Sequence, residues 1–117
     1  EAVFMIKIAP SILSADFANL ERDIHRIAAA DYVHVDVMDG VFVNNITFGI
    51  KMVEDLRKIT TLPLDCHLMI VHPEKDVEGF AKLKISLATS IPASTPASLI
   101  SNFDFPIAVA GIHERVV

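Results

Sequence analysis

The chain has 117 residues and a net charge of −5, and 52% of its residues are hydrophobic while 21% are charged. This length suffices for one modest domain with a core, and this composition excludes a disordered chain. The net negative charge does not predict a nucleic-acid-binding surface, because such surfaces are usually basic. No apolar run approaches the roughly 20 residues that a membrane helix needs. A single cysteine, Cys66, excludes an internal disulfide. We therefore expect a cytoplasmic protein without nucleic-acid or membrane partners.

Strands and amphipathic helices are expected to alternate along residues 1–84. Apolar residues at period two predict strands, and apolar residues at spacings of three and four predict helices. The predicted strands are residues 5–9, 31–38 and 64–69. Three helices are predicted: the first begins after the N-cap Asp16, the second covers residues 50–60 and the third covers residues 77–84. Such alternation with short connections predicts a parallel sheet built from right-handed βαβ units.

The composition changes beyond residue 84. Residues 85–117 hold only three of the 25 charged residues of the chain. The expected elements there are a strand at residues 84–88, a loop at residues 89–98 and a strand at residues 106–112. We therefore divide the chain into an N-terminal βαβαβα part, residues 1–84, and a divergent or discontinuous remainder of the same domain, residues 85–117.

The strand predicted at residues 31–38 has two unlike faces. Valines alternate with His34, Asp36 and Met38, and successive side chains of a strand point to opposite faces. A buried parallel strand is normally an almost unbroken apolar run. The polar residues therefore indicate either an edge strand that faces water or a functional face, and both interpretations stay open for this strand alone.

The strand predicted at residues 64–69 repeats this pattern, because Asp65 and His67 share one face. Two histidines and one carboxylate on neighbouring parallel strands can meet in space and hold a divalent metal. The candidate ligands are therefore His34, Asp36 and His67. Asp65 could orient the imidazole of His67 from a second layer around the metal.

The loop at residues 41–49 is unusually apolar for a solvated segment. Such a loop could cover a pocket, or it could pack on the end of the sheet. Asp39 and Gly40, which precede it, are residues typical of turns.

Four motifs resemble the ribulose-phosphate 3-epimerase family, which includes allulose-6-phosphate 3-epimerases. The motifs are KIAPSILSADF at residues 7–17, HVDVMDG at 34–40, NITFG at 45–49 and LPLDCHLM at 62–69. The resemblance implies an α/β fold, a (β/α)8 TIM barrel of the ribulose-phosphate-binding type with its site at the carboxyl ends of the strands. A full barrel needs roughly 200 residues or more, so this chain is expected to form only a partial barrel.

The resemblance also implies an activity, the metal-dependent epimerisation at C3 of a ketose phosphate through an enediolate. The substrate would be of the ribulose 5-phosphate/xylulose 5-phosphate type, as in the pentose phosphate pathway. The positions matching His34, Asp36 and His67 bind one divalent metal in the family, usually zinc, iron, manganese or cobalt. The carboxylate matching Asp36 is also one of two acid/base groups.

Three further positions match residues that contact the substrate, namely Ser11, Met38 and Met69. The second acid/base aspartate of the family lies on the seventh strand of the barrel, and we find no counterpart to it; Asp104 does not match. The alternative is therefore a catalytically incomplete half-barrel remnant that binds metal or a partner without epimerase activity. Because an open parallel sheet leaves strand edges unpaired, we also expect a homo-oligomer.

Overall fold

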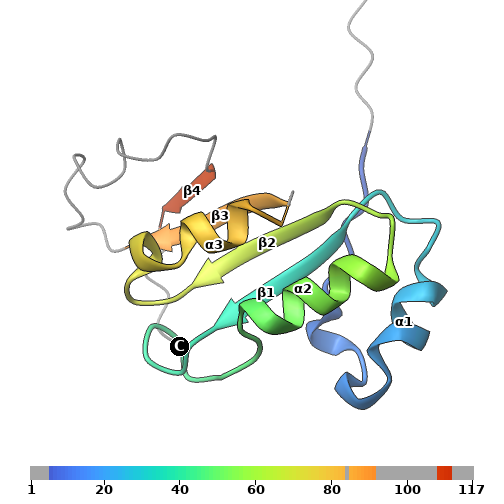
Figure 1. The fold of residues 1–117 in the computed structure, drawn as a ribbon, viewed down its shortest axis with the longest axis horizontal. Helices are drawn as coiled ribbons and strands as arrows, with labels where there is room; N and C mark the ends of the chain where they lie inside the picture. Colours follow the sequence, from blue (N-terminus) through green and yellow to red (C-terminus); the bar gives the residue numbers. More distant parts are fainter. Residues whose placement is uncertain (1–5, 84, 92–107, 112–117) are drawn as a thin grey trace, which may run out of the picture.

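The computed structural model describes residues 6–83, 85–91 and 108–111 (Figure 1). Within these residues, four strands form one parallel sheet in the order β1-β2-β3-β4. The strands are β1 (Val33–Met38), β2 (Leu64–Met69), β3 (Ser86–Ile91) and β4 (Ala108–Gly111). The α-helices are α1 (Leu20–Arg26), α2 (Ile50–Ile59) and α3 (Val77–Ala81), and the 3-10 helices are η1 (Ile12–Ser14), η2 (Phe17–Asn19) and η3 (Pro73–Lys75).

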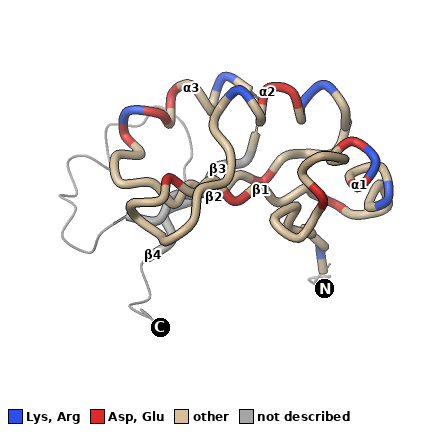
Figure 2. The backbone as a smooth tube through the Cα atoms, turned by 90° about the horizontal axis from the view of Figure 1, so that it is seen from below, with Lys and Arg blue, Asp and Glu red and all other residues tan. Residues whose placement is uncertain are grey.

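The helices cover one face of the sheet. Figure 2 shows α2 and α3 on the same side of the strands, with α1 beyond β1. Along β1 and β2, buried residues alternate with half-buried ones. The buried set is apolar and packs with Ile24 of α1, Leu56 of α2 and Phe80 of α3. This arrangement of parallel strands under helices is consistent with part of a barrel, and it leaves the half-buried residues of β1 and β2 on the face away from the helices.

The single cysteine belongs to the buried face. Cys66 lies in β2 with no exposed surface, and burial raises the pKa of its thiol to about 12. The thiol is therefore protonated at neutral pH and acts in packing.

The predicted first strand is not present in the described residues 6–9. The segment does lie beside β1, because Ile8 O accepts from Asp31 N and Pro10 O accepts from His34 N. A strand ladder needs donors as well as acceptors, and Pro10 has no N–H to donate. The prediction of a strand is therefore wrong for these residues, although their position next to the sheet is as expected.

The helix predicted after Asp16 begins as a 3-10 turn. The carboxylate of Asp16 accepts from Ala18 N at 3.0 Å and so caps η2, and α1 follows directly. Helix α3 ends earlier than expected, because Leu83 N donates to Phe80 O in an i→i−3 bond that closes the helix. Lys84, the predicted last residue of that helix, lies outside the described residues.

Strand β3 extends further than predicted. Residues 89–91 were expected in a loop, but Thr89 pairs with Leu68 of β2, and Ile91 pairs with Gly111 of β4. Pairing on both sides overrides the weak local preference of this Ser- and Thr-containing segment. The last strand is confirmed at Ala108–Gly111, while residues 106, 107 and 112 of that prediction lie outside the described residues.

The helices of the described residues are too short or too polar to cross a membrane.

Candidate functional site

The register between β1 and β2 builds the candidate site. The strands pair in parallel so that His34 lies opposite Asp65 and Asp36 lies opposite His67. Because side chains alternate along a strand, these four residues share the face away from the helices. All four are half-buried. The polar face predicted from the alternation is therefore formed, and it lies on paired strands.

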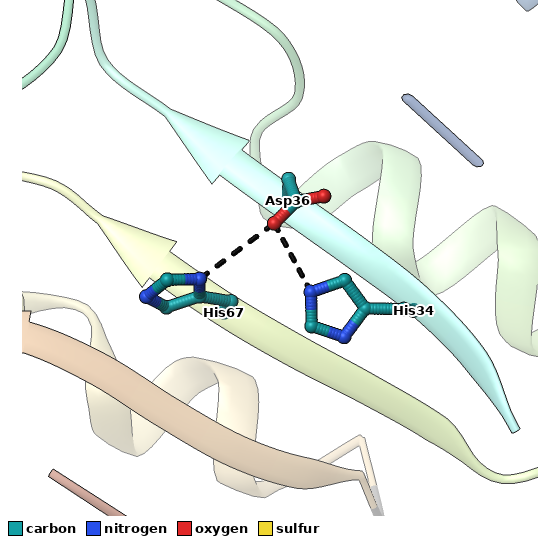
Figure 3. A group of neighbouring side chains, drawn as sticks. All are labelled: His34, Asp36 and His67. Carbon is teal, nitrogen blue, oxygen red and sulfur yellow. Dashed lines mark hydrogen bonds and ion pairs between the residues drawn. The ribbon is translucent and has the colours of Figure 1, made fainter. Parts of the chain in front are cut away.

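Two of the three predicted metal ligands, His34 and His67, converge on a carboxylate oxygen of the third, Asp36 (Figure 3). Asp36 Oδ1 lies 3.1 Å from His34 Nε2 and 3.6 Å from His67 Nδ1. One ligand atom from each residue lies within 4.8 Å of the others. Two imidazole nitrogens and one carboxylate oxygen are a donor set that zinc or iron takes in proteins. The residues present therefore fit a divalent metal.

Asp65 contacts a different histidine from the one expected. Its Oδ2 lies 2.9 Å from His34 Nδ1, across the strand pair. The prediction placed it beside His67 because the two residues share a face of β2. In a parallel pair in this register, however, the nearest residue to Asp65 is its direct partner His34.

Burial and charge move the two imidazole pKa values apart. Burial lowers the pKa of His34, but the hydrogen bond to Asp65 and the charges of Asp36 and Asp65 raise it above the ordinary value. Burial is the largest influence on His67 and, with the nearby His34, lowers the pKa of His67 despite the charge of Asp36. The same carboxylates therefore act more strongly on His34 than on His67, and burial outweighs them only at His67.

Ser11 holds the second oxygen of Asp36. Its Oγ donates to Asp36 Oδ2 at 2.6 Å and accepts from Leu13 N at 3.2 Å, so the same hydroxyl caps η1. Ser11 also forms a parallel bridge with His34. Both oxygens of Asp36 therefore have partners, and the carboxylate is fixed in orientation.

Thr47 is a site-supporting residue that the sequence did not predict. Its Oγ1 donates to Asp36 O at 2.6 Å and accepts from Met38 N at 3.0 Å, and its N–H donates to Met38 O. These bonds close the loop back onto the end of β1. The sequence gives one indication of this role: Thr47 is the single threonine of the apolar loop at residues 41–49, and this loop follows the strand that carries Asp36.

The apolar loop at residues 41–49 packs on the end of the sheet, one of the two roles expected for it. Phe48 is buried and packs on Phe17 with ring centroids 4.7 Å apart, while Val41 and Ile46 are largely exposed. Phe48 also lines a cavity of about 200 Å³ at the carboxyl end of β1. The loop therefore packs on the sheet end and borders a cavity at the same time.

Asp39 joins the ends of β1 and β2. Its Oδ1 accepts from Val41 N and Phe42 N, and its Oδ2 accepts from Val71 N, each at 2.9 Å. Burial acts to raise the pKa of Asp39, but these backbone N–H groups together lower it. Gly40 has a φ of +77°, which disfavours residues with a side chain. The turn expected at these two residues is confirmed.

The comparison with protein families decides what kind of protein carries this site. The model of the ribulose-phosphate 3 epimerase family matches residues 7–99. The chain belongs to this family. The match includes all four motifs noted in the sequence, and both strands that carry the candidate ligands.

Curated relatives of the family have similar sequences. The chain is 56% identical over 80 residues to "Ribulose-phosphate 3-epimerase" of Bacillus subtilis, covering 67% of this chain and 37% of that protein. It is 58% identical over 79 residues to the protein of the same name from Synechocystis, covering 66% and 34%. It is 51% identical over 78 residues to "Ribulose-phosphate 3-epimerase, cytoplasmic isoform" of Oryza sativa, covering 65% and 34%. The chain thus spans about a third of the length of the curated relatives it matches.

The methionines that match the family's substrate-lining positions lie on the ligand face. Met38 and Met69 are direct partners at the carboxyl ends of β1 and β2, two residues beyond Asp36 and His67. Both are half-buried. They are therefore placed beside the candidate metal ligands, at the end of the sheet where the family's barrel has its site. Asp104, which did not match the second acid/base aspartate, lies outside the described residues.

Proposed function

We propose that His34, Asp36 and His67 bind one divalent metal, and that the protein epimerises C3 of a ketose phosphate of the ribulose 5-phosphate/xylulose 5-phosphate type. The observation that carries the proposal is the convergence of two imidazoles on one carboxylate oxygen. The curated relatives, named ribulose-phosphate 3-epimerases, support the reaction and a sugar-phosphate substrate.

The fold belongs to the same proposal. The described sheet would be part of a (β/α)8 barrel, with residues 1–84 as its N-terminal portion and residues 85–117 as a remainder of the same domain. In such a barrel the face of β1 and β2 away from the helices would point into the barrel, and its carboxyl end would open onto the substrate. The helices on a single face of the sheet support this view (Figure 2).

The chemistry requires removal of the proton at C3, which is α to the C2 carbonyl. A divalent metal in the site supplies positive charge that stabilises the negative charge developing on the C2 oxygen. Asp36 would be the acid/base group: its Oδ1 faces the imidazoles, and its Oδ2, which accepts from Ser11, would exchange the proton through its other lone pair. Ser11 holds Oδ2 in place and would also contact the substrate.

Met38 and Met69 would form the wall beside the reacting carbons. Thioethers are polarisable and apolar, so they exclude water without displacing the substrate from a metal that prefers nitrogen and oxygen ligands. The donor set of two histidines and one aspartate would suit zinc, iron, manganese or cobalt. Elemental analysis of the purified protein identifies which of these it carries.

The decisive test measures deuterium at C3. Metal-loaded protein is incubated with ribulose 5-phosphate in D2O. NMR then measures the replacement of hydrogen by deuterium at C3, as a signal separate from that of C1. We expect exchange at C3 that Asp36→Asn abolishes. Asp55→Asn is the matched control, because Asp55 lies on α2 and pairs with Lys51 and Lys58.

The same experiment separates the two candidate functions. Inversion needs a second acid/base group on the opposite face of the substrate, and the sequence holds no segment that resembles the family's Val-Asp-Gly-Gly. Exchange at C3 therefore supports epimerase chemistry at Asp36 even where little product of inverted configuration forms. A metal-loaded protein without any exchange would contradict the epimerase and favour a half-barrel that binds metal or a partner.

A further inference from the structure

One of the candidate ligands is held on both sides of its ring. His34 Nε2 lies 3.1 Å from Asp36 Oδ1, and His34 Nδ1 lies 2.9 Å from Asp65 Oδ2. Asp36 comes from the same strand, two residues further on, while Asp65 comes from the neighbouring strand at the directly opposite position. The imidazole of His34 is therefore held by one carboxylate from its own strand and by one from β2.

We propose that Asp65 is a positioning residue that fixes the tautomer and the ring orientation of His34, so that Nε2 faces the metal. This inference rests on the metal site proposed above and adds a function to a residue outside the ligand set. A carboxylate at Nδ1 accepts the N–H of that nitrogen and leaves the lone pair of Nε2 free for coordination. It also makes the imidazole a stronger ligand.

The geometry favours positioning over a purely structural contact. The side chains of His34 and Asp65 are 25% and 34% exposed, so solvent screening reduces what this ion pair adds to folding stability. The two strands are already joined by their backbone ladder over six pairs of residues. Orientation of the ring is therefore the main consequence of the contact.

The contact also determines which nitrogen of His34 is left to coordinate. With Nδ1 of His34 engaged by Asp65, His34 is left to coordinate through Nε2. His67 approaches Asp36 through Nδ1, at 3.6 Å. The two histidines therefore bind the metal through different ring nitrogens, and this asymmetry is specific enough to measure.

The first test compares zinc affinities of the purified protein and its variants, using competition with a chromogenic chelator. We expect Asp65→Asn to bind zinc about 10- to 100-fold more weakly. Asp55→Asn, the same change of charge on α2, keeps the original affinity. Circular dichroism establishes that both variants are folded. Asp65→Asn with undiminished zinc affinity would overturn the positioning role.

The second test needs no substitution and so does not depend on a variant that folds. Long-range ¹H–¹⁵N NMR of the zinc-loaded protein distinguishes a protonated ring nitrogen from a metal-bound one. We expect His34 to show a protonated Nδ1 and a zinc-bound Nε2, and His67 to show a zinc-bound Nδ1. Zinc on Nδ1 of His34 would refute the inference.

The two tests also separate this inference from the function on which it rests. If the unsubstituted protein binds no zinc in stoichiometric amount, the metal site fails and the role of Asp65 fails with it. If zinc binds but Asp65→Asn changes neither the affinity nor the coordinating nitrogen, only the role of Asp65 fails.

Discussion

Ser11 and Asp36 lie 25 positions apart and are joined by a 2.6 Å hydrogen bond from the serine hydroxyl to Oδ2 of the carboxylate. The bond connects the segment before η1 to the centre of β1. It gives the KIAPSILSADF motif a physical role, because the turn that caps η1 also sets the orientation of the candidate acid/base group.

Replacing Ser11 by Ala should slow exchange at C3 by about tenfold or more. A hydrogen bond to a charged group is worth about 1.5–3 kcal/mol, and about 1.4 kcal/mol corresponds to a factor of ten in rate. Ser14→Ala, an exposed serine of the same 3-10 turn, is the control. Equal exchange rates for the two variants would show that Ser11 does not orient Asp36 during the reaction.

Replacing His67 by Ala should lower the metal content of the purified protein, because it removes one of two nitrogen ligands. Elemental analysis after gel filtration gives the number of metal ions per chain. His72→Ala serves as the control, since His72 is exposed and pairs with Glu74 at the start of η3. Full metal occupancy in His67→Ala would remove His67 from the proposed ligand set.

Asp39 should contribute stability that depends on pH. The pKa of Asp39 is lowered in the folded protein by backbone N–H groups, although burial acts in the opposite direction. A lowered folded pKa means that the stabilisation is present above the unfolded pKa of about 3.9 and is lost as pH falls through the folded pKa.

Urea unfolding of the unsubstituted protein and of Asp39→Asn measures this contribution. The variant should be less stable at pH 7, and the difference between the two should shrink as the pH falls below about 4. A difference that stays constant from pH 7 to pH 3 would mean that the charge of Asp39 does not matter.

Replacing Thr47 by Val should destabilise the protein by about 1–3 kcal/mol, since it leaves Met38 N without its side-chain acceptor and Asp36 O without its donor. Thr47→Ser keeps the hydroxyl and should restore most of the stability. Chemical unfolding followed by circular dichroism compares the three proteins. Similar losses in both variants would point to the methyl group rather than the hydroxyl.

The grouping of His34, Asp36 and His67 could be predicted because alternation along a strand is a local property. His34 and Asp36 on one strand and His67 on the next had to share faces once both strands formed in a parallel sheet. The partner of Asp65 could not be predicted in the same way. It depends on the register between β1 and β2, and a different register would have placed another residue opposite.

The errors in the fold have the same origin. Residues 6–9 have strand-like composition, but Pro10 interrupts the hydrogen bonding that would have made them a strand. Residues 89–91 have little strand preference of their own, yet pairing with β2 and β4 places them in the sheet. Thr47 was missed because its hydrogen bonds join a loop to a strand end, and no periodic pattern marks such a contact.

The position of Cys66 allows thiol labelling of this residue to measure opening of the sheet. Its sulfur is buried on the helix-facing side of β2, one residue before His67 on the opposite face. A thiol reagent can reach it only when the sheet beneath the metal ligands opens, so the labelling rate follows the population of the open state. Zinc that binds only the closed sheet will slow labelling by a factor of 1 + [Zn]/Kd. Mass spectrometry of the labelled protein would thus measure the occupancy of the proposed metal site through a residue outside the proposed ligand set.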